Sequence, residues 1–371
     1  MRAIAAGTVF LSHVLALYFF ADPGAQNTAS KVLFLGKGFI GVSFFFILSG
    51  FVLTWVSRDT DTIRAFWRRR AMKIFPNHVL TFIAAVVLLA YIMGQPQGLL
   101  TALVNLSLLH AWFGLATASS FNTVAWTLSC EALFYLLFPF ILPLIRRIRG
   151  QWLWACCGAL VVVIWIIPYL ATLSDPGPTS NPTLPPDHQY WAIYILPAAR
   201  LPEFILGMVL ARVVASGRRI PVGVGGGIAL TLLAGLLADL LPLRYGLVAV
   251  WVVPLALTVA AGAVADVEGR QTFLSGRAMV WLGDISFAFY LWHLLVLATG
   301  RTYWTPPQGY ATPAAIVMIL ALLGVIILIS WATFALYERP LMRRFARARR
   351  RLTPLAPVSP ADSVRRSADP V

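Results

Sequence analysis

Charge is scarce in this sequence of 371 residues: only 12% are Asp, Glu, Lys or Arg, whereas 59% are hydrophobic. The mean hydropathy is +0.80, well outside the usual balance of a water-soluble domain. Apolar runs of roughly 20 residues, long enough to cross a bilayer as a helix, recur from end to end of the chain. The sequence leaves no room for a separate soluble domain and predicts one polytopic membrane domain.

Cysteine and lysine are also rare. The cysteines Cys130, Cys156 and Cys157 lie inside apolar runs, and their spacing fits neither a metal site nor a disulfide framework. We expect no bound metal and no bound cofactor. The net charge of +15 comes from 26 Arg and 3 Lys that lie mostly in short loops between the runs and in the C-terminal tail. That placement is typical of membrane topology and not of a nucleic-acid partner, so the expected partner is the lipid bilayer.

The apolar runs predict an all-α polytopic bundle of about ten transmembrane helices. One further apolar segment, 101–118, is short and carries Asn105, Ser107 and His110, so we expect it to be re-entrant or interfacial. The expected spans are 3–20, 38–57, 76–94, 122–145, 152–172, 191–213, 222–241, 245–264, 279–299 and 312–337.

Loop charge predicts the orientation of these spans. The loop 58–75 contains six basic residues and is therefore expected on the cytoplasmic side, as is the N-terminus. If 101–118 does not cross, the basic segments 146–149, 212–219 and 339–351 also fall inside. We expect a protein of the cytoplasmic (inner) membrane with both termini cytoplasmic. Residues 1–342 form the membrane domain, and 343–371 a basic, then disordered, cytoplasmic tail.

Ionisable residues inside the spans carry the functional signal, because each costs roughly 2.5–3.5 kcal/mol at a bilayer centre unless it is paired or hydrated. Arg2 and His13 are eleven residues apart, which on a helix is roughly 16 Å along nearly one face. A neutral histidine at that depth can accept a proton from a hydroxyl group. The alternative interpretation of His13 is a histidine hydrogen-bonded to a neighbouring helix.

Glu131 lies in the middle of the span 122–145, and Thr127, Glu131 and Tyr135 form one polar stripe at helical spacing. A buried carboxylate is a protonated structural acid, the partner of a cation, or the group that orients a catalytic histidine. The third role suits acyl transfer, because the carboxylate fixes the imidazole tautomer and stabilises the imidazolium. Sequence alone does not decide between these roles.

Three other groups support the predicted site. Ser286, Tyr290 and His293 form a second polar stripe, whose simpler role is hydrogen bonding between helices. Arg200 and Glu203 form an i, i+3 pair that neutralises itself and is expected to be architectural. Arg70 and Lys73 stand three residues apart, with Pro76 expected near the first turn of the next helix, where they can bind phosphates of a cytoplasmic donor such as coenzyme A. Anchoring by positive-inside charge is the alternative for this basic pair.

With these residues in place, the chain resembles acyltransferase family 3, the integral membrane acyltransferases that modify surface sugars, peptidoglycan and macrolides. The resemblance spans nearly the whole chain. Its motifs are Arg2 with His13, then 41–51, the basic stretch ending at 73–76, 126–131, 200–207, 286–293 and 337–340.

The resemblance implies ten core helices, His13 as catalytic base, and an Arg-x-x-Arg motif that maps to Arg70 and Lys73. Lys73 replaces the second Arg, which keeps the charge but loses the bidentate fork. The expected reaction takes an acyl group from acyl-coenzyme A as co-substrate to a hydroxyl-bearing acceptor: a sugar, a glycolipid or a macrolide-type metabolite. A transporter or flippase, and a non-catalytic scaffold, remain as alternatives, because buried ionisable groups also occur there.

Overall fold

The computed structural model describes residues 1–32, 39–58, 60–175, 177–270 and 276–346. Within these ranges the chain is built from helices, with one isolated bridge between Phe20 and Tyr310. The α-helices are α1 (Arg2–Ala16), α2 (Pro23–Val32), α3 (Phe39–Trp55), α4 (Ile63–Val86), α5 (Leu99–Leu106), α6 (Leu115–Ala118), α7 (Trp126–Arg147), α8 (Leu153–Leu170), α9 (Asp187–Tyr190), α10 (Pro197–Ala215), α11 (Val224–Ala238), α12 (Leu243–Gly246), α13 (Ala249–Val267), α14 (Arg277–Tyr303), α15 (Thr312–Ala332) and α16 (Arg339–Leu341).

The predicted membrane-helical fold is confirmed. In the described part of the chain, seven helices are long and apolar enough to cross a membrane, and α1, α3 and α11 are shorter apolar helices. These elements fall on the ten segments expected from hydropathy, but the number that cross stays a prediction. The seven longer helices are Ile63–Ala90, Thr123–Arg147, Gly150–Leu173, Asp187–Ala215, Leu243–Val267, Arg277–Tyr303 and Thr312–Phe345.

The segment 101–118 does not form one long helix. It is divided between α5, a short 3-10 turn at His110–Trp112, and α6. The chain breaks where Leu108 and Gly114 adopt positive φ angles of 61° and 91°, which a right-handed helix cannot contain. Each piece is too short to cross a bilayer, as expected of a re-entrant or interfacial segment.

Helix α4 begins earlier than predicted, which corrects the expected loop 58–75. Thr62 caps the helix by accepting a hydrogen bond from the Ala65 amide at 3.2 Å, so the helix starts at Ile63. Pro76 consequently lies inside the helix and not near its first turn. Hydropathy missed this start because the first turns carry four arginines and Lys73, which lower the apolar average without preventing helix formation.

The tail expected over 343–371 lies outside the described residues from 347 onward, and the domain boundary at 342 stays a prediction. A helical turn, Met342–Ala346, still follows α16 at the start of that range.

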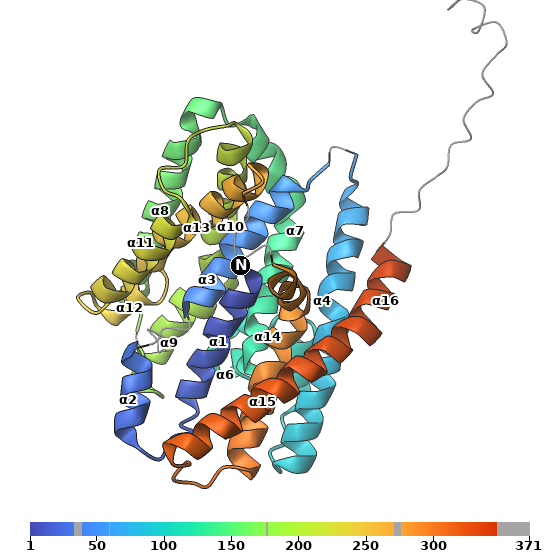
Figure 1. The fold of residues 1–371 in the computed structure, drawn as a ribbon. Coiled ribbons are helices and arrows are strands. Elements are labelled where there is room, and N and C mark those ends of the chain that lie inside the picture. The colour runs from blue at the N-terminus through green and yellow to red at the C-terminus, as the bar shows by residue number, and fades with distance from the viewer. Residues whose placement is uncertain (33–38, 59, 176, 271–275, 347–371) are drawn as a thin grey trace, which may run out of the picture.

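Helices α1 and α14 pack against each other near the middle of the bundle, and α3 packs against both α1 and α10 (Figure 1). Helix α15 covers α14 on one flank, and its widened continuation, Thr333–Glu338, contacts α4. Helices α8, α11 and α13 form the opposite flank (Figure 1). The N-terminal helix is thus enclosed by segments far from it in sequence.

The contact between α3 and α10 is unusually close because it is made by glycine. A Cβ atom added to Gly50 would lie 1.9 Å from the Phe204 carbonyl oxygen, and one added to Gly207 would lie 1.9 Å from the Ile47 carbonyl oxygen. Small residues let helix backbones approach in a bilayer, where dispersion contacts replace the hydrophobic effect between helices. Gly50 and Gly207 belong to two of the motifs that carry the family resemblance.

Apolar side chains also cover the outside of the bundle. On α15, Val317, Leu320 and Leu328 are 67%, 59% and 62% exposed, and no polar residue lies between them in the sequence. A protein in water rarely exposes such a continuous apolar surface. Lipid is therefore the natural surrounding of this helix.

Replacing Gly207 with Ala should separate α3 from α10, because the new methyl group has no space beside the Ile47 carbonyl. We expect a loss of about 1–3 kcal/mol, measured as a lower midpoint of thermal unfolding of the detergent-purified protein. Gly158→Ala on α8 is the matched control, since its Cβ meets nothing within 4 Å. Equal midpoints for the two variants would show that the close contact does not stabilise the fold.

Candidate active site

A cavity of about 90 Å³ lies between α1, α3, α4, α7 and α14. Seven of the eleven residues predicted for the site line it, although they come from four different helices. These seven are Arg2, Arg70, Lys73, Glu131, Tyr135, Ser286 and Tyr290. The remaining wall is largely apolar and comes from α3 and α7, including Phe45, Phe46, Leu48 and Leu128.

The stripe on α7 faces this cavity. The Tyr135 hydroxyl donates to the Glu131 carboxylate at 3.3 Å, as their i, i+4 spacing allows. The Arg70 guanidinium lies 5.7 Å from the centre of the Tyr135 ring. Glu131 also interacts electrostatically with Arg2, Lys73 and Arg70. One carboxylate thus shares the cavity with three cations.

Lys73 is held by a carboxylate that sequence reasoning left without a role. The Lys73 ammonium forms an ion pair with Glu338, which is 2% exposed. The Asn77 side-chain amide donates to the second oxygen of Glu338 at 2.6 Å. Glu338 belongs to the motif 337–340. Its position directly after an apolar span was the sequence signal for a carboxylate that pairs with a cation. Lys73 lies at the cavity with its charge already compensated.

His13 and His293 lie against each other beside the cavity. The His13 Nδ1 atom is 3.2 Å from His293 Nε2, and the two rings meet edge to face. The His293 ring is 5.7 Å from the ring of Tyr290, a residue of the cavity wall. Because His293 follows Tyr290 by three residues, the pair sits about one helical turn from the wall.

The backbone assigns the hydrogens of the neutral pair. The Tyr290 carbonyl lies 2.6 Å from His293 Nδ1 and can only accept, so this nitrogen carries the hydrogen and His293 Nε2 is left as an acceptor. His13 Nδ1 must then be the donor, and it is also 2.9 Å from the Val9 carbonyl. The remaining nitrogen, His13 Nε2, is the unprotonated atom. A hydroxyl proton can be accepted there.

Glu131 is not the hydrogen-bond partner of His13, although it was considered as the group that orients it. Within the described residues, His13 bonds Val9 and His293, and Glu131 bonds Tyr135. Helical spacing put Glu131 on one face with Thr127 and Tyr135, which line the cavity with it. Which faces meet depends on how α1 packs on α14, and this is a tertiary contact.

Arg200 and Glu203 lie apart from the cavity, as an internal pair. Both are completely buried, with Arg200 Nε 2.8 Å from Glu203 Oε2, and Arg200 also donates to Ser43 at 2.9 Å. The Arg200 guanidinium lies 5.2 Å from the ring of Phe46, whose side chain lines the cavity. The pair therefore supports the cavity wall from behind.

Comparison with known proteins identifies the family of the chain. A family pattern described as an acyltransferase domain matches residues 1–334. The chain belongs to acyltransferase family 3. It is therefore an enzyme that transfers acyl groups other than aminoacyl groups, and the transporter and scaffold alternatives are set aside.

Relatives within the family have varied names. The chain is 35% identical to Acyltransferase MdmB of Streptomyces mycarofaciens, covering 94% of this chain and 92% of that protein. It is 30% identical to exopolysaccharide production protein ExoZ of Rhizobium meliloti, covering 84% and 92%. Peptidoglycan O-acetyltransferase OatA of Listeria monocytogenes is 22% identical over 70% of this chain and 45% of its own length. No solved structure matches the chain significantly.

Replacing Glu338 with Gln should destabilise the fold, because Lys73 loses its charge partner while Asn77 keeps an acceptor. We expect a loss of about 1–3 kcal/mol, measured by thermal unfolding in detergent. Glu268→Gln is the control, because its ion pair with Arg270 is exposed and is expected to contribute less than about 1 kcal/mol. If Lys73→Met fails to reduce the penalty of Glu338→Gln, the two side chains are not coupled.

Proposed function

We propose that this family member is an O-acyltransferase that moves an acyl group from acyl-coenzyme A to a hydroxyl of a sugar, glycolipid or macrolide-type metabolite. The observation that carries the proposal is the contact of His13 Nδ1 with His293, which leaves Nε2 unprotonated about one helical turn from a cavity lined by three cations. A positioned base and a polyanion-binding cavity are the two requirements for moving an acyl group from such a donor to a hydroxyl.

In the proposed reaction, His13 Nε2 takes the proton of the acceptor hydroxyl as the oxygen attacks the thioester carbonyl. The carbon–oxygen bond forms, the carbon–sulfur bond breaks, and coenzyme A leaves as a thiolate. The His13 imidazolium returns the proton to that thiolate, so the free base is restored. His293 accepts a hydrogen bond from His13 Nδ1 throughout and stabilises the imidazolium, as a carboxylate does in a hydrolase triad.

Arg2, Arg70 and Lys73 line the donor cavity in this proposal and attract the negative charge of coenzyme A. Glu131 balances the charge of these cations. It helps to position Arg70 through its hydrogen bond to Tyr135, and it attracts Arg2 across the cavity. The apolar wall from α3 and α7 keeps water from the thioester. Ser286 bonds its own helix, at the Gly283 carbonyl, and completes the wall.

In this proposal the protein lies in the inner membrane, and the basic end of its helical bundle faces the cytoplasm. This orientation is supported by the concentration of arginine on that end and by the positive-inside rule. It gives the cavity mouth, at Arg2, direct access to cytoplasmic acyl-coenzyme A. The names of the relatives, which refer to exopolysaccharide production and peptidoglycan O-acetylation, support a hydroxyl-rich acceptor.

Converting His13 to Ala should lower acyl transfer by about 10²- to 10⁴-fold, because the proton acceptor is lost. The measurement is release of free coenzyme A from acetyl-coenzyme A with a macrolide, an exopolysaccharide or peptidoglycan fragments as acceptor. His188→Ala, at an exposed histidine outside the site, is the control. Retention of activity in a folded His13→Ala protein would rule out the proposed base.

Replacing His293 tests whether it positions His13 through a hydrogen bond. His293→Phe keeps a ring but loses the acceptor, and we expect kcat to fall about 10²-fold with little change in KM for the donor. His293→Gln offers an amide oxygen to His13 Nδ1 and should recover part of the loss. If the His293→Phe and His293→Gln variants lose kcat equally at equal thermal stability, His293 acts through packing alone.

A further inference from the structure

A second chamber, here named the arginine chamber, lies next to the candidate active site. It has a volume of about 470 Å³ and lies between the end of α3, the connection into α4, and α7. Arg70 lines both this chamber and the active-site cavity. The two spaces therefore meet at one guanidinium, and a long ligand could occupy both.

The arginine chamber is strongly basic. Among the residues that the structure describes, it is lined by four arginines, Arg58, Arg69, Arg70 and Arg146, and one carboxylate, Asp61. Of these four, only Arg70 was predicted from the sequence as a phosphate ligand. Guanidinium groups are suited to phosphate because they present parallel N–H donors.

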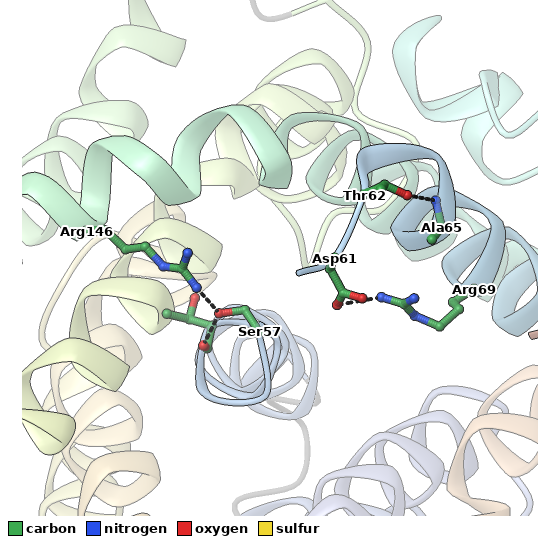
Figure 2. A network of polar contacts seen from close by, with 7 residues as sticks. Ser57, Asp61, Thr62, Ala65, Arg69 and Arg146 are labelled. Atoms are coloured by element: carbon green, nitrogen blue, oxygen red, sulfur yellow. Dashed lines mark hydrogen bonds and ion pairs between the residues drawn. The ribbon is translucent and has the colours of Figure 1, made fainter. Parts of the chain in front are cut away.

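These arginines are held around the rim by local contacts. Arg69 lies 2.7 Å from Asp61, and the Arg146 guanidinium donates to the Ser57 hydroxyl at 3.0 Å; both contacts are drawn in Figure 2. In the same view, Thr62 caps the start of α4. No acidic residue lies in the first turn of α4, so the positive end of this 24-residue helix adds to the field at the rim.

Arg70 retains a donor at the junction of the two spaces. Its guanidinium carbon lies 5.7 Å from the centres of the Phe66 and Tyr135 rings, which fix its position. Its Nε atom is buried and has no hydrogen-bond partner within the described residues. A buried donor without a partner costs free energy, and a ligand that accepts its hydrogen bond removes this cost.

The inner wall of the arginine chamber is apolar. The Phe66 and Phe138 rings are stacked, with centroids 4.9 Å apart, and Leu142 and Pro139 lie beside them. A ligand with phosphates at one end and a flat base at the other matches this division between charged rim and apolar wall.

We propose that the arginine chamber binds the phosphorylated nucleotide of the thioester donor, while the acyl end reaches past Arg70 into the active-site cavity. The proposal rests on the function proposed above and changes which residues bind phosphate. Lys73 is already compensated by Glu338 and Arg69 by Asp61, so Arg58 and Arg146 become the principal phosphate ligands. The Arg70 Nε donor lies where the two parts of the ligand join.

The test is binding of coenzyme A and of adenosine 3′,5′-bisphosphate to the full chain in phosphatidylcholine nanodiscs. Arg146→Gln and Arg58→Gln should each weaken both ligands by about tenfold, the effect of one lost charge-assisted hydrogen bond. Arg147→Gln, next in sequence to Arg146 but outside the chamber, should bind like the unaltered protein. Arg58 is exposed, so its variant provides a result even if Arg146→Gln fails to fold.

The outcomes separate this proposal from the function on which it rests. If the unaltered protein binds coenzyme A but the Arg58 and Arg146 variants bind it equally well, the arginine chamber is not the nucleotide site and the proposed function stands. If the unaltered protein binds no coenzyme A, both fail. Competition by phosphatidylglycerol that requires Arg146 would assign the arginine chamber to a lipid phosphate and overturn the nucleotide proposal.

Discussion

Ionisable side chains in a membrane domain are costly unless they are paired or hydrated. The contact between Lys73 and Glu338 pairs two such groups and connects α4 to the continuation of α15, 265 residues away. Asn77 adds a second contact from α4 to the same carboxylate. The ion pair therefore closes the bundle on one side of the active-site cavity. Both the shape of the cavity and the position of Lys73 depend on it.

On the opposite wall, the close approach of α3 and α10 has a comparable effect without charge. Gly50 and Gly207 bring the backbones together, and the Arg200–Glu203 pair fills the adjacent space behind Phe46. Helix α3 supplies much of the apolar wall, so its position sets the cavity width. In the proposed reaction, residues with no chemical role would thus determine whether water is excluded from the thioester.

The direction of one backbone hydrogen bond has chemical consequences. Because the Tyr290 carbonyl can only accept, it fixes the hydrogen on His293 and, through it, the hydrogen on His13. In the proposed mechanism, neutral His293 takes the place that a carboxylate occupies in a hydrolase triad, which avoids adding a negative charge to the membrane domain. Glu131 is then available to balance the cations of the cavity.

The sequence alone determined the properties that depend on local patterns. Hydropathy located the membrane helices, and helical spacing placed Glu131 with Tyr135 on one face of a helix. The tertiary structure decided which faces meet: His13 contacts His293 from 280 residues away, and Glu338 takes Lys73. Hydropathy averages also concealed the early start of α4, since its arginines are helix formers but not apolar. Spacing along one helix carries no information about the neighbouring helix, so partners and cavities were decided by packing.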